Sequence, residues 1–317
     1  MLTEFMRFIS FIGSAGFYLP ILVLVFWCVS PRVGARAAVV LAFSAAINTL
    51  LKLLWHAPRP YWTDQSVKAH QSLSSFGMPS GHAQGSAVAW GLAGVQARRR
   101  AVWVLVVAVV FLVGVSRVYL GMHSIQQVLA GWGIGVALLV LALALEPIVV
   151  PWWTRRALAV QLLLSVVVAA AVLAATALAV EALSGRPLPE AWARAIELAG
   201  GRVRPVSLAQ GGAATGTLLG VLTGLSWLAH SGWLDAGGSP LRRLARVPLG
   251  FAGAAAIWVV GLFAGTQVIV VFVVHTLLSL WITAGAPAAF VRLGLARREV
   301  SAVRAESLAQ GDTRSVT

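Results

Sequence analysis

Long apolar stretches, each close to the length of one bilayer crossing, dominate this sequence of 317 residues. A helix needs about 20 apolar residues to cross the hydrocarbon core, because each residue advances it by only about 1.5 Å. Charged residues make up 11% of the chain, whereas a soluble domain carries about 25%. The sequence therefore predicts an all-α, polytopic transmembrane helical bundle and excludes a soluble fold.

We predict about nine spans. The third has the weakest signal because it is short and rich in Gly and Ala, and the seventh, rich in Gly and Thr, is expected to pack inside the bundle. The predicted spans are residues 8–29, 37–55, 80–97, 101–118, 124–146, 157–182, 208–230, 247–264 and 266–290.

The basic residues indicate the orientation of the chain. The formal net charge is +14, but Lys and Arg lie between apolar runs, so we expect contact with anionic membrane lipids and no nucleic-acid partner. With nine spans, 15 of the 24 Lys and Arg residues fall on the side of the C-terminus. Because cytoplasmic loops collect Lys and Arg, the C-terminus is predicted to be cytoplasmic and the N-terminus external.

Four further features limit the class of protein. The single cysteine, Cys28, lies in the first span and cannot form an internal disulfide. No Cys or His spacing is typical of a metal site, so neither a metal nor a cofactor is expected. Residues 298–317 are polar and are expected to form a disordered tail. A composition rich in Ala, Arg, Trp and Val is typical of a GC-rich bacterium, which favours a multi-pass plasma membrane protein.

The first of three candidate motifs is KLLWHAPRP, residues 52–60. Pro58 and Pro60 end the helix and stiffen the turn around Arg59. The point charge of Lys52 and the planar fork of Arg59 suit a phosphate group if they converge. The alternative is a pair of interfacial cations whose stems run along the lipid.

The second motif is GMPSGHAQG, residues 77–85. Pro79, Ser80 and Gly81 make a turn into a helix, whose free N–H groups and positive dipole end form an anion site. Gly81 lets the backbone approach a ligand, and His82 faces the same anion from the first turn. The alternative is that Ser80 serves only as a helix cap.

The third motif is SRVYLGMHSIQQ, residues 116–127. Arg117 ends the fourth span and His123 begins the fifth, and ionisable residues at a membrane edge favour a functional role over a structural one. All three motifs lie at the outer ends of spans two to five, and Asp64 is the only acidic residue between the first motif and the last. A pocket built from them is strongly cationic, and its natural ligand is a phosphate.

Together the motifs resemble K-x6-RP, PSGH and SR-x5-H-x3-D of the type 2 phosphatidic acid phosphatase superfamily. That superfamily includes lipid phosphate phosphatases, glucose-6-phosphatase and vanadium haloperoxidases. The resemblance covers roughly residues 40–145, and its final Asp is Gln127 here. Glucose-6-phosphatase is similar in that Gln and in RPYW at residues 59–62, whereas PSGHAQ and the GW at residues 131–132 look equally like bacterial lipid phosphatases.

The resemblance implies a catalytic core in residues 1–150, with residues 151–297 adding helices that complete the bundle. It implies a metal-independent phosphatase in which His123 attacks phosphorus to form a phosphohistidine and His82 protonates the leaving oxygen. The phosphoryl oxygens would be held by Lys52, Arg59, Ser80, Gly81 through its N–H, and Arg117. Such a cluster supplies the positioning and charge neutralisation that phosphoryl transfer needs, and vanadate is expected to inhibit it.

Gln127 lies four residues after His123, on the same helix face. Its carbonyl can accept the ring N–H of His123, fix the tautomer and leave the other nitrogen free to attack. It cannot stabilise an imidazolium as a carboxylate does.

The expected function is an extracytoplasmic membrane phosphatase that acts on the phosphomonoester or pyrophosphate of a lipid or isoprenoid. A lipid is favoured because the pocket opens at headgroup height. One alternative is a sugar-phosphate phosphatase similar to glucose-6-phosphatase. The other is a catalytically weak protein that binds or transports lipid phosphates, with Gln127 marking the lost chemistry.

The second half of the chain repeats none of these motifs. A stripe of glycines on the seventh span is expected to pack within the bundle, with a homodimer seam as the alternative, and His275 is expected to be a hydrogen-bonded core residue. The second outer loop, residues 184–207, predicts a short helix at the membrane interface or on the surface. Arg202 and Arg204 either reach the pocket mouth or anchor this loop. The glycines of the stripe are Gly212, Gly216, Gly220 and Gly224.

Overall fold

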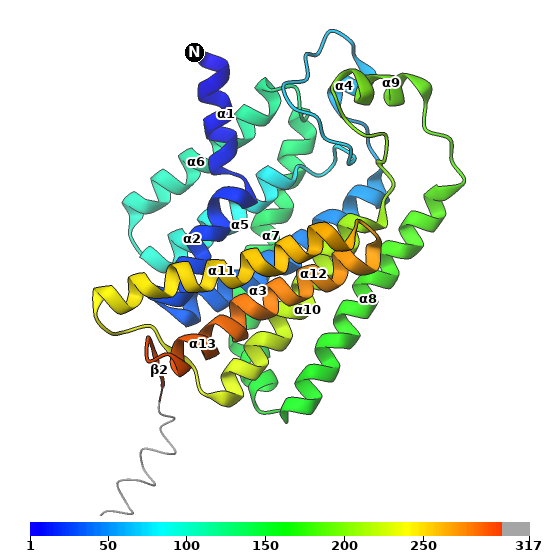
Figure 1. The fold of residues 1–317 in the computed structure, drawn as a ribbon. Coiled ribbons are helices and arrows are strands. Elements are labelled where there is room, and N and C mark those ends of the chain that lie inside the picture. The colour runs from blue at the N-terminus through cyan, green and yellow to red at the C-terminus, as the bar shows by residue number, and fades with distance from the viewer. Residues whose placement is uncertain (300–317) are drawn as a thin grey trace, which may run out of the picture.

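Helices are the dominant structure of the computed structural model, which describes residues 1–299 (Figure 1). Each predicted span contains a helix. The elements are α1 (Leu2–Ile12), α2 (Ala15–Cys28), α3 (Pro31–Trp55), α4 (Pro60–Thr63), α5 (Gly81–Ala97), α6 (Arg100–Tyr119), α7 (Ile125–Thr154), α8 (Leu158–Ser184), α9 (Glu190–Leu198), α10 (Leu208–Ser231), β1 (Leu234–Asp235), α11 (Pro240–Ala264), α12 (Val268–Leu280), the π-helix η1 (Trp281–Gly285), α13 (Ala286–Arg292) and β2 (Arg297–Arg298).

The transmembrane bundle predicted from the sequence is confirmed. Seven helical segments of the described chain are long and apolar enough to cross a membrane, and an eighth results if α1 and α2 count as one. The first span is not the continuous helix that we predicted, because α1 and α2 meet at a bend of 41°. α5 has 17 residues and is shorter than the seven, so the count of nine stays a prediction.

Serine residues set where several helices begin. Ser30, Ser80, Ser124 and Ser239 each accept a hydrogen bond from a backbone N–H in the first turn of α3, α5, α7 and α11. Each bond satisfies a group that has no partner inside its helix. The polar residues between the apolar runs thus define the helix boundaries.

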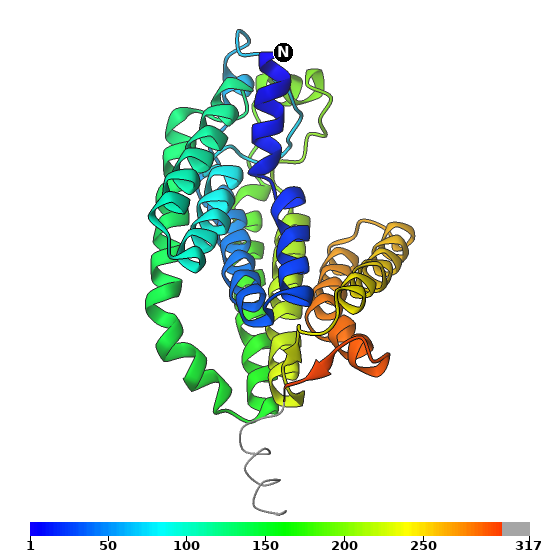
Figure 2. The same ribbon diagram turned by 90° about the vertical axis from the view of Figure 1, so that its left-hand side faces the viewer.

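The helices near the motifs and the C-terminal helices form two neighbouring groups. α5 packs against α3, α6 and α7, while α10 packs against α3, α8 and α12. Figure 2 shows the hairpin of α11 and α12 projecting from the side of the bundle. The N-terminus lies at one end of the molecule with α4 and α9, and β2 lies toward the other end (Figure 1).

The glycine stripe of α10 packs inside the bundle, as expected. A side chain on Gly216 or Gly220 would overlap the backbone of α12 at Phe272 or Thr276. Because α12 covers this stripe, the four glycines present no free face to a second copy of the chain. The prediction for His275, a core residue bonded to a neighbouring helix, is wrong: the side chain is half-buried, and its Nδ1 lies 2.8 Å from the carbonyl oxygen of Val271 in its own helix, α12.

The predicted tail begins later than expected. Arg298 belongs to β2, which pairs with β1 in antiparallel fashion. The rest of that prediction falls on residues 300–317, which lie outside the described residues. The proposed division into a core and additional helices stays a prediction.

Arg246 on α11 connects several segments at the end of the molecule that carries β2. Its side chain is fully buried and donates to the carbonyl oxygens of Trp27, Ala236, Gly237 and Leu295 at 2.5–3.0 Å. These carbonyls belong to the end of α2, the segment after β1 and the segment after α13. One guanidinium therefore joins three parts of the chain that are far apart in sequence.

We predict that Arg246→Met lowers the stability of the folded protein by roughly 3 kcal/mol, because several buried carbonyls lose their donor. Thermal unfolding of the detergent-solubilised protein, followed by tryptophan fluorescence, measures the effect. Arg243→Met, at an exposed position one turn away, is the matched control and should change stability by less than about 0.5 kcal/mol. Equal stability of the two variants would contradict the role given to Arg246.

Candidate active site

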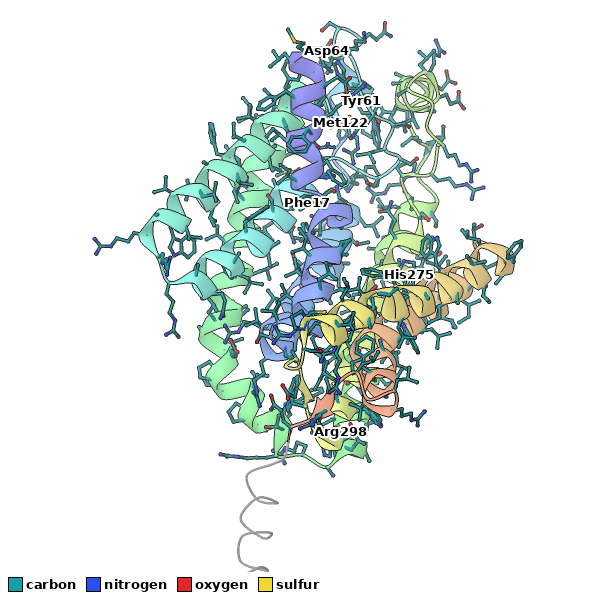
Figure 3. All side chains as sticks on the ribbon, turned by 60° about the vertical axis from the view of Figure 1, so that its left-hand side comes forward. Phe17, Tyr61, Asp64, Met122, His275 and Arg298 are labelled. Carbon is teal, nitrogen blue, oxygen red and sulfur yellow. The ribbon has the colours of Figure 1, made fainter. Side chains whose placement is uncertain are left out.

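Three separate segments meet at the end of the molecule that carries the N-terminus. They are the end of α3 with the loop to α4, the start of α5, and the turn between α6 and α7. In Figure 3, Tyr61 and Met122 mark this end and Arg298 marks the other. The meeting brings together all eight site residues predicted from the sequence.

The first segment contributes two buried cations. Lys52, in the last turn of α3, donates from Nζ to the carbonyl oxygen of Phe76 at 2.7 Å. Arg59 is 1% exposed and donates to the carbonyl oxygens of Ser75 at 2.7 Å and Met122 at 3.0 Å. Arg59 lies between Pro58 and Pro60, and Pro60 is the first residue of α4. The backbone of Arg59 is therefore restricted on both sides.

The second segment contributes a helix N-terminus. Ser80 caps α5 by accepting from the N–H of Ala83, and its own N–H donates to the carbonyl oxygen of Gln127 at 3.0 Å. Gly81 and His82 are only half-buried, which leaves the first turn of α5 accessible. Within residues 1–299 the ring of His82 makes no hydrogen bond, so both of its nitrogens are available for proton transfer.

Arg117 is completely buried near the end of α6. Its Nη1 donates to Ser10 Oγ at 2.6 Å and to Gln71 Oε1 at 3.1 Å. Its Nε and Nη2 are buried and have no hydrogen-bond partner within the described chain. Buried donors of this kind are costly unless an acceptor reaches them, and an anion provides one.

His123 lies in the turn between α6 and α7 and is 2% exposed. Its Nδ1 is 2.9 Å from the carbonyl oxygen of Gly77 and 3.1 Å from Gln127 Oε1. Both neighbours are acceptors, so Nδ1 carries the proton and Nε2 keeps a lone pair. Nη1 of Arg59 faces Nε2 at 3.2 Å.

Burial and the nearby positive charges of Arg59, Lys52 and Arg117 lower the pKa of His123 well below its usual value, against the opposing effect of its hydrogen bond to Gln127. The imidazole therefore stays neutral at neutral pH. A neutral ring with an unprotonated Nε2 is the form that can act as a nucleophile once the hydrogen bond from Arg59 to that nitrogen is given up.

Gln127 makes the contact with His123 that its spacing predicted, and two more. Its Oε1 also accepts from the N–H of Ser124 at 3.3 Å, and its Nε2 donates to the carbonyl oxygen of Pro58 at 2.7 Å. The side chain is therefore an acceptor toward α7 and a donor toward the loop before Arg59. A carboxylate has no proton for the second contact.

Several polar residues at the site were not predicted. Asn48, one turn before Lys52 on α3, donates to Gln84 Oε1 at 2.8 Å, and Gln84 donates to the hydroxyl and carbonyl of Ser44. This buried network supports the start of α5. The signal for Asn48 was its spacing of four residues from Lys52, whereas nothing in the sequence singled out Ser10 or Gln71.

The predicted second outer loop, residues 184–207, packs against the segment that contains α4. Trp192 of α9 lies 5.9 Å from Trp62 of α4, measured between ring centroids, and Ile196 is fully buried. The predicted short helix thus packs on the protein. Arg202 and Arg204 are exposed. Among residues 1–299 no three His, Cys, Asp or Glu side chains lie close enough together to hold a metal ion.

Family models match two parts of the chain. The model of the PAP2 superfamily matches residues 34–151, which contain all three motifs. The model of the PAP2 superfamily phosphatase, transmembrane extension, matches residues 212–298, from α10 to β2.

Individual proteins are also similar to part of the chain. Phosphatidylglycerophosphatase B of Bacillus subtilis (strain 168) is 29% identical over 150 residues, which are 43% of this chain and 71% of that protein. Sphingosine-1-phosphate phosphatase 2 of Mus musculus is 30% identical over 39% of this chain. Lipid phosphate phosphatase delta of Arabidopsis thaliana is 26% identical over 44% of this chain. The chain spans 37% of each of the last two proteins.

A crystal structure of a transmembrane PAP2-type phosphatidylglycerolphosphate phosphatase from Bacillus subtilis is also similar. It is 26% identical, covers 46% of this chain and 77% of its own, and superposes with a TM-score of 0.40. Two family models match separate parts of the chain, and the first of them contains Lys52, Arg117 and His123. Residues 34–151 therefore belong to the PAP2 superfamily, and residues 212–298 match the transmembrane extension of its phosphatases.

Proposed function

We propose that this protein is a metal-independent membrane phosphatase that hydrolyses a phosphate or pyrophosphate ester of a lipid or isoprenoid. The observation that carries the proposal is the pairing of a neutral His123, whose unprotonated Nε2 accepts a hydrogen bond from Arg59, and Arg117, with two buried donors that lack partners in the described chain. The first supplies a nucleophile and the second an anion site. A phosphoryl group needs both.

In the first step Nε2 of His123 attacks phosphorus, the bond to the leaving oxygen breaks, and His82 gives that oxygen a proton. In the second step a water molecule attacks phosphorus, the bond from phosphorus to Nε2 breaks, and His82 takes the proton from the water. Lys52, Arg59 and Arg117, with Ser80 and the N–H of Gly81, hold the phosphoryl oxygens. Splitting hydrolysis into two displacements lowers each barrier.

A lipid substrate is supported by the relatives, whose names include a phosphatidylglycerophosphatase, a sphingosine-1-phosphate phosphatase and a lipid phosphate phosphatase. The site also lies at one end of the bundle, where a headgroup is within reach. A sugar phosphate is the second candidate, on the strength of Gln127 and of Tyr61 and Trp62 after the first motif. A weak protein that binds or transports lipid phosphates is the third.

The extracytoplasmic location of the site in the plasma membrane is part of the proposal. It rests on the excess of Lys and Arg on the side of the C-terminus. The N-terminus and the site share one end of the molecule (Figure 1), so one topology measurement tests both.

We predict that His123→Ala lowers kcat at least about 1,000-fold, because the nucleophile is lost. A rapid alkaline quench should trap a phosphorylated protein in the wild type and none in the variant. His230→Ala, which changes an exposed histidine in the last turn of α10, outside the three motifs, is the control. Activity on phosphatidic acid, undecaprenyl pyrophosphate and glucose 6-phosphate ranks the substrate classes. A wild type that forms no phosphoprotein and cleaves none of the three supports the binding protein instead.

We predict that Gln127→Asp moves the acid limb of the kcat/KM profile to higher pH by roughly one unit while KM changes little. A carboxylate beside the ring favours the imidazolium and raises the pKa of His123, so the neutral nucleophile is lost at a higher pH. Gln127→Glu keeps the length but turns an oxygen toward the carbonyl of Pro58, so it should show the same shift with a larger loss of kcat. Identical profiles for all three proteins would mean that Gln127 does not contact His123 during turnover.

We predict that Lys68→Cys in a Cys28→Ser background reacts with a membrane-impermeant thiol reagent in intact cells. Arg155→Cys, in the exposed turn after α7, should react only after the cells are opened. Both positions are exposed, so the difference reports the side of the membrane and not burial. The reverse pattern would place the site in the cytoplasm.

A further inference from the structure

Arg117 is held by two side chains that lie outside the three motifs. Ser10 comes from α1 and is 2% exposed, while Gln71 comes from the loop between α4 and α5 and is exposed. Each accepts one hydrogen bond from Nη1 of Arg117. Nη1 of Arg117 is thus fixed by one residue of a helix and by one residue of a loop.

The position of Ser10 results from the way α1 packs along α6. Three contacts follow the pair in antiparallel order: Thr3 Oγ1 lies 3.1 Å from the hydroxyl of Tyr119, Ser10 bonds Arg117, and Gly13 lies against Val113. A Cβ on Gly13 would overlap a methyl group of Val113, so only glycine permits this approach. The bend after Gly13 then lets α2 leave α6.

The other face of α1 is apolar and exposed, with four large side chains 50–57% accessible. In a membrane this face meets lipid, so the inward direction of Ser10 is set by the amphipathic pattern of the helix. The four side chains are Leu2, Phe5, Phe8 and Phe11.

Neutral acceptors suit a guanidinium that must bind an anion. A carboxylate on Nη1 would cancel much of the positive charge, whereas a hydroxyl and an amide oxygen orient the group and leave its charge in place. The free edge of Arg117, with Nε and Nη2, is then held toward the site. Because α1 lies outside residues 34–151, which match the superfamily model, this support comes from beyond the common core.

We propose that Ser10 is a positioning residue, through which α1 orients Arg117 toward the phosphoryl group in its transition state. This inference rests on the proposed phosphatase function. Gln71 holds the same Nη1 atom from the mouth of the site. An orientation that matters in the transition state affects kcat and the binding of a transition-state mimic more than it affects KM.

The test measures hydrolysis of phosphatidic acid in detergent micelles and inhibition by vanadate. Ser10→Ala is expected to lower kcat about tenfold, to weaken vanadate inhibition by a similar factor, and to change KM by less than about threefold. Thr3→Val, which removes another α1 contact at a distance from Arg117, should leave all three values unchanged. Vanadate binding measured by thermal shift extends the test to a protein that does not cleave phosphatidic acid.

A second pair of variants tests the packing of α1 independently of Ser10. Gly13→Ala should push α1 away from α6 and reproduce the effect of Ser10→Ala. Adding Val113→Ala, which removes the overlapping methyl groups, should restore most of the lost kcat and vanadate affinity. Recovery in the double variant supports the proposal, because a general folding defect is not repaired by a second truncation.

Two results would overturn the inference. One is a Ser10→Ala protein with wild-type kcat and vanadate affinity. The other is a loss of kcat with unchanged vanadate affinity, which would assign Ser10 a role in folding only. Both leave the phosphatase proposal intact, because that proposal depends on the phosphoprotein formed by the wild type and lost in His123→Ala.

Discussion

Buried cations held by neutral acceptors are the constraint on which the rest of this structure depends. Lys52, Arg59 and Arg117 are at most 9% exposed, and none of the ion pairs in the described chain includes any of them. Removing such charges from water costs several kcal/mol each. Carbonyl oxygens of Ser75, Phe76 and Met122 offset part of that cost, so the loop before α5 and the turn before α7 must be ordered for the cations to be buried.

Arg246 is also a buried cation held by neutral acceptors, and all of its guanidinium nitrogens have partners. It uses all three of its guanidinium nitrogens on carbonyl oxygens, whereas Arg117 leaves Nε and Nη2 without a partner in the described chain. Arg117 and Arg246 are both fully buried, but within the described chain only Arg246 has a hydrogen-bond acceptor for each of its guanidinium nitrogens. We infer that Arg246 stabilises the fold, whereas Arg117 keeps two donors for the phosphate ligand that we propose.

Local patterns were enough to predict much of the fold and the site. Apolar runs located the helices, and the spacing within each motif placed Lys52, Arg59 and His123 at helix ends that meet. The contact between His123 and Gln127 followed from a separation of four residues on one helix. Ser10 and Gln71 were not predictable in this way, because they reach Arg117 across 107 and 46 residues through the packing of α1 and of a loop. The bend between α1 and α2 was missed for the same reason, since it follows from close packing between Gly13 and Val113.

The presence of an amide and not a carboxylate at position 127 is explained by all the neighbours of that side chain, and not by His123 alone. Burial and three cations already keep the imidazole neutral, so for the attack that we propose the ring needs the correct tautomer more than it needs a counter-charge. The carbonyls of Gly77 and Gln127 supply that tautomer together. The third neighbour of the amide is the carbonyl of Pro58, which requires a donor, and its bond ties α7 to the loop that carries Arg59. A carboxylate would favour the charged ring and break that hydrogen bond, so the neutral side chain aligns His123 and Arg59, for which we propose the roles of nucleophile and phosphate-binding residue, with each other.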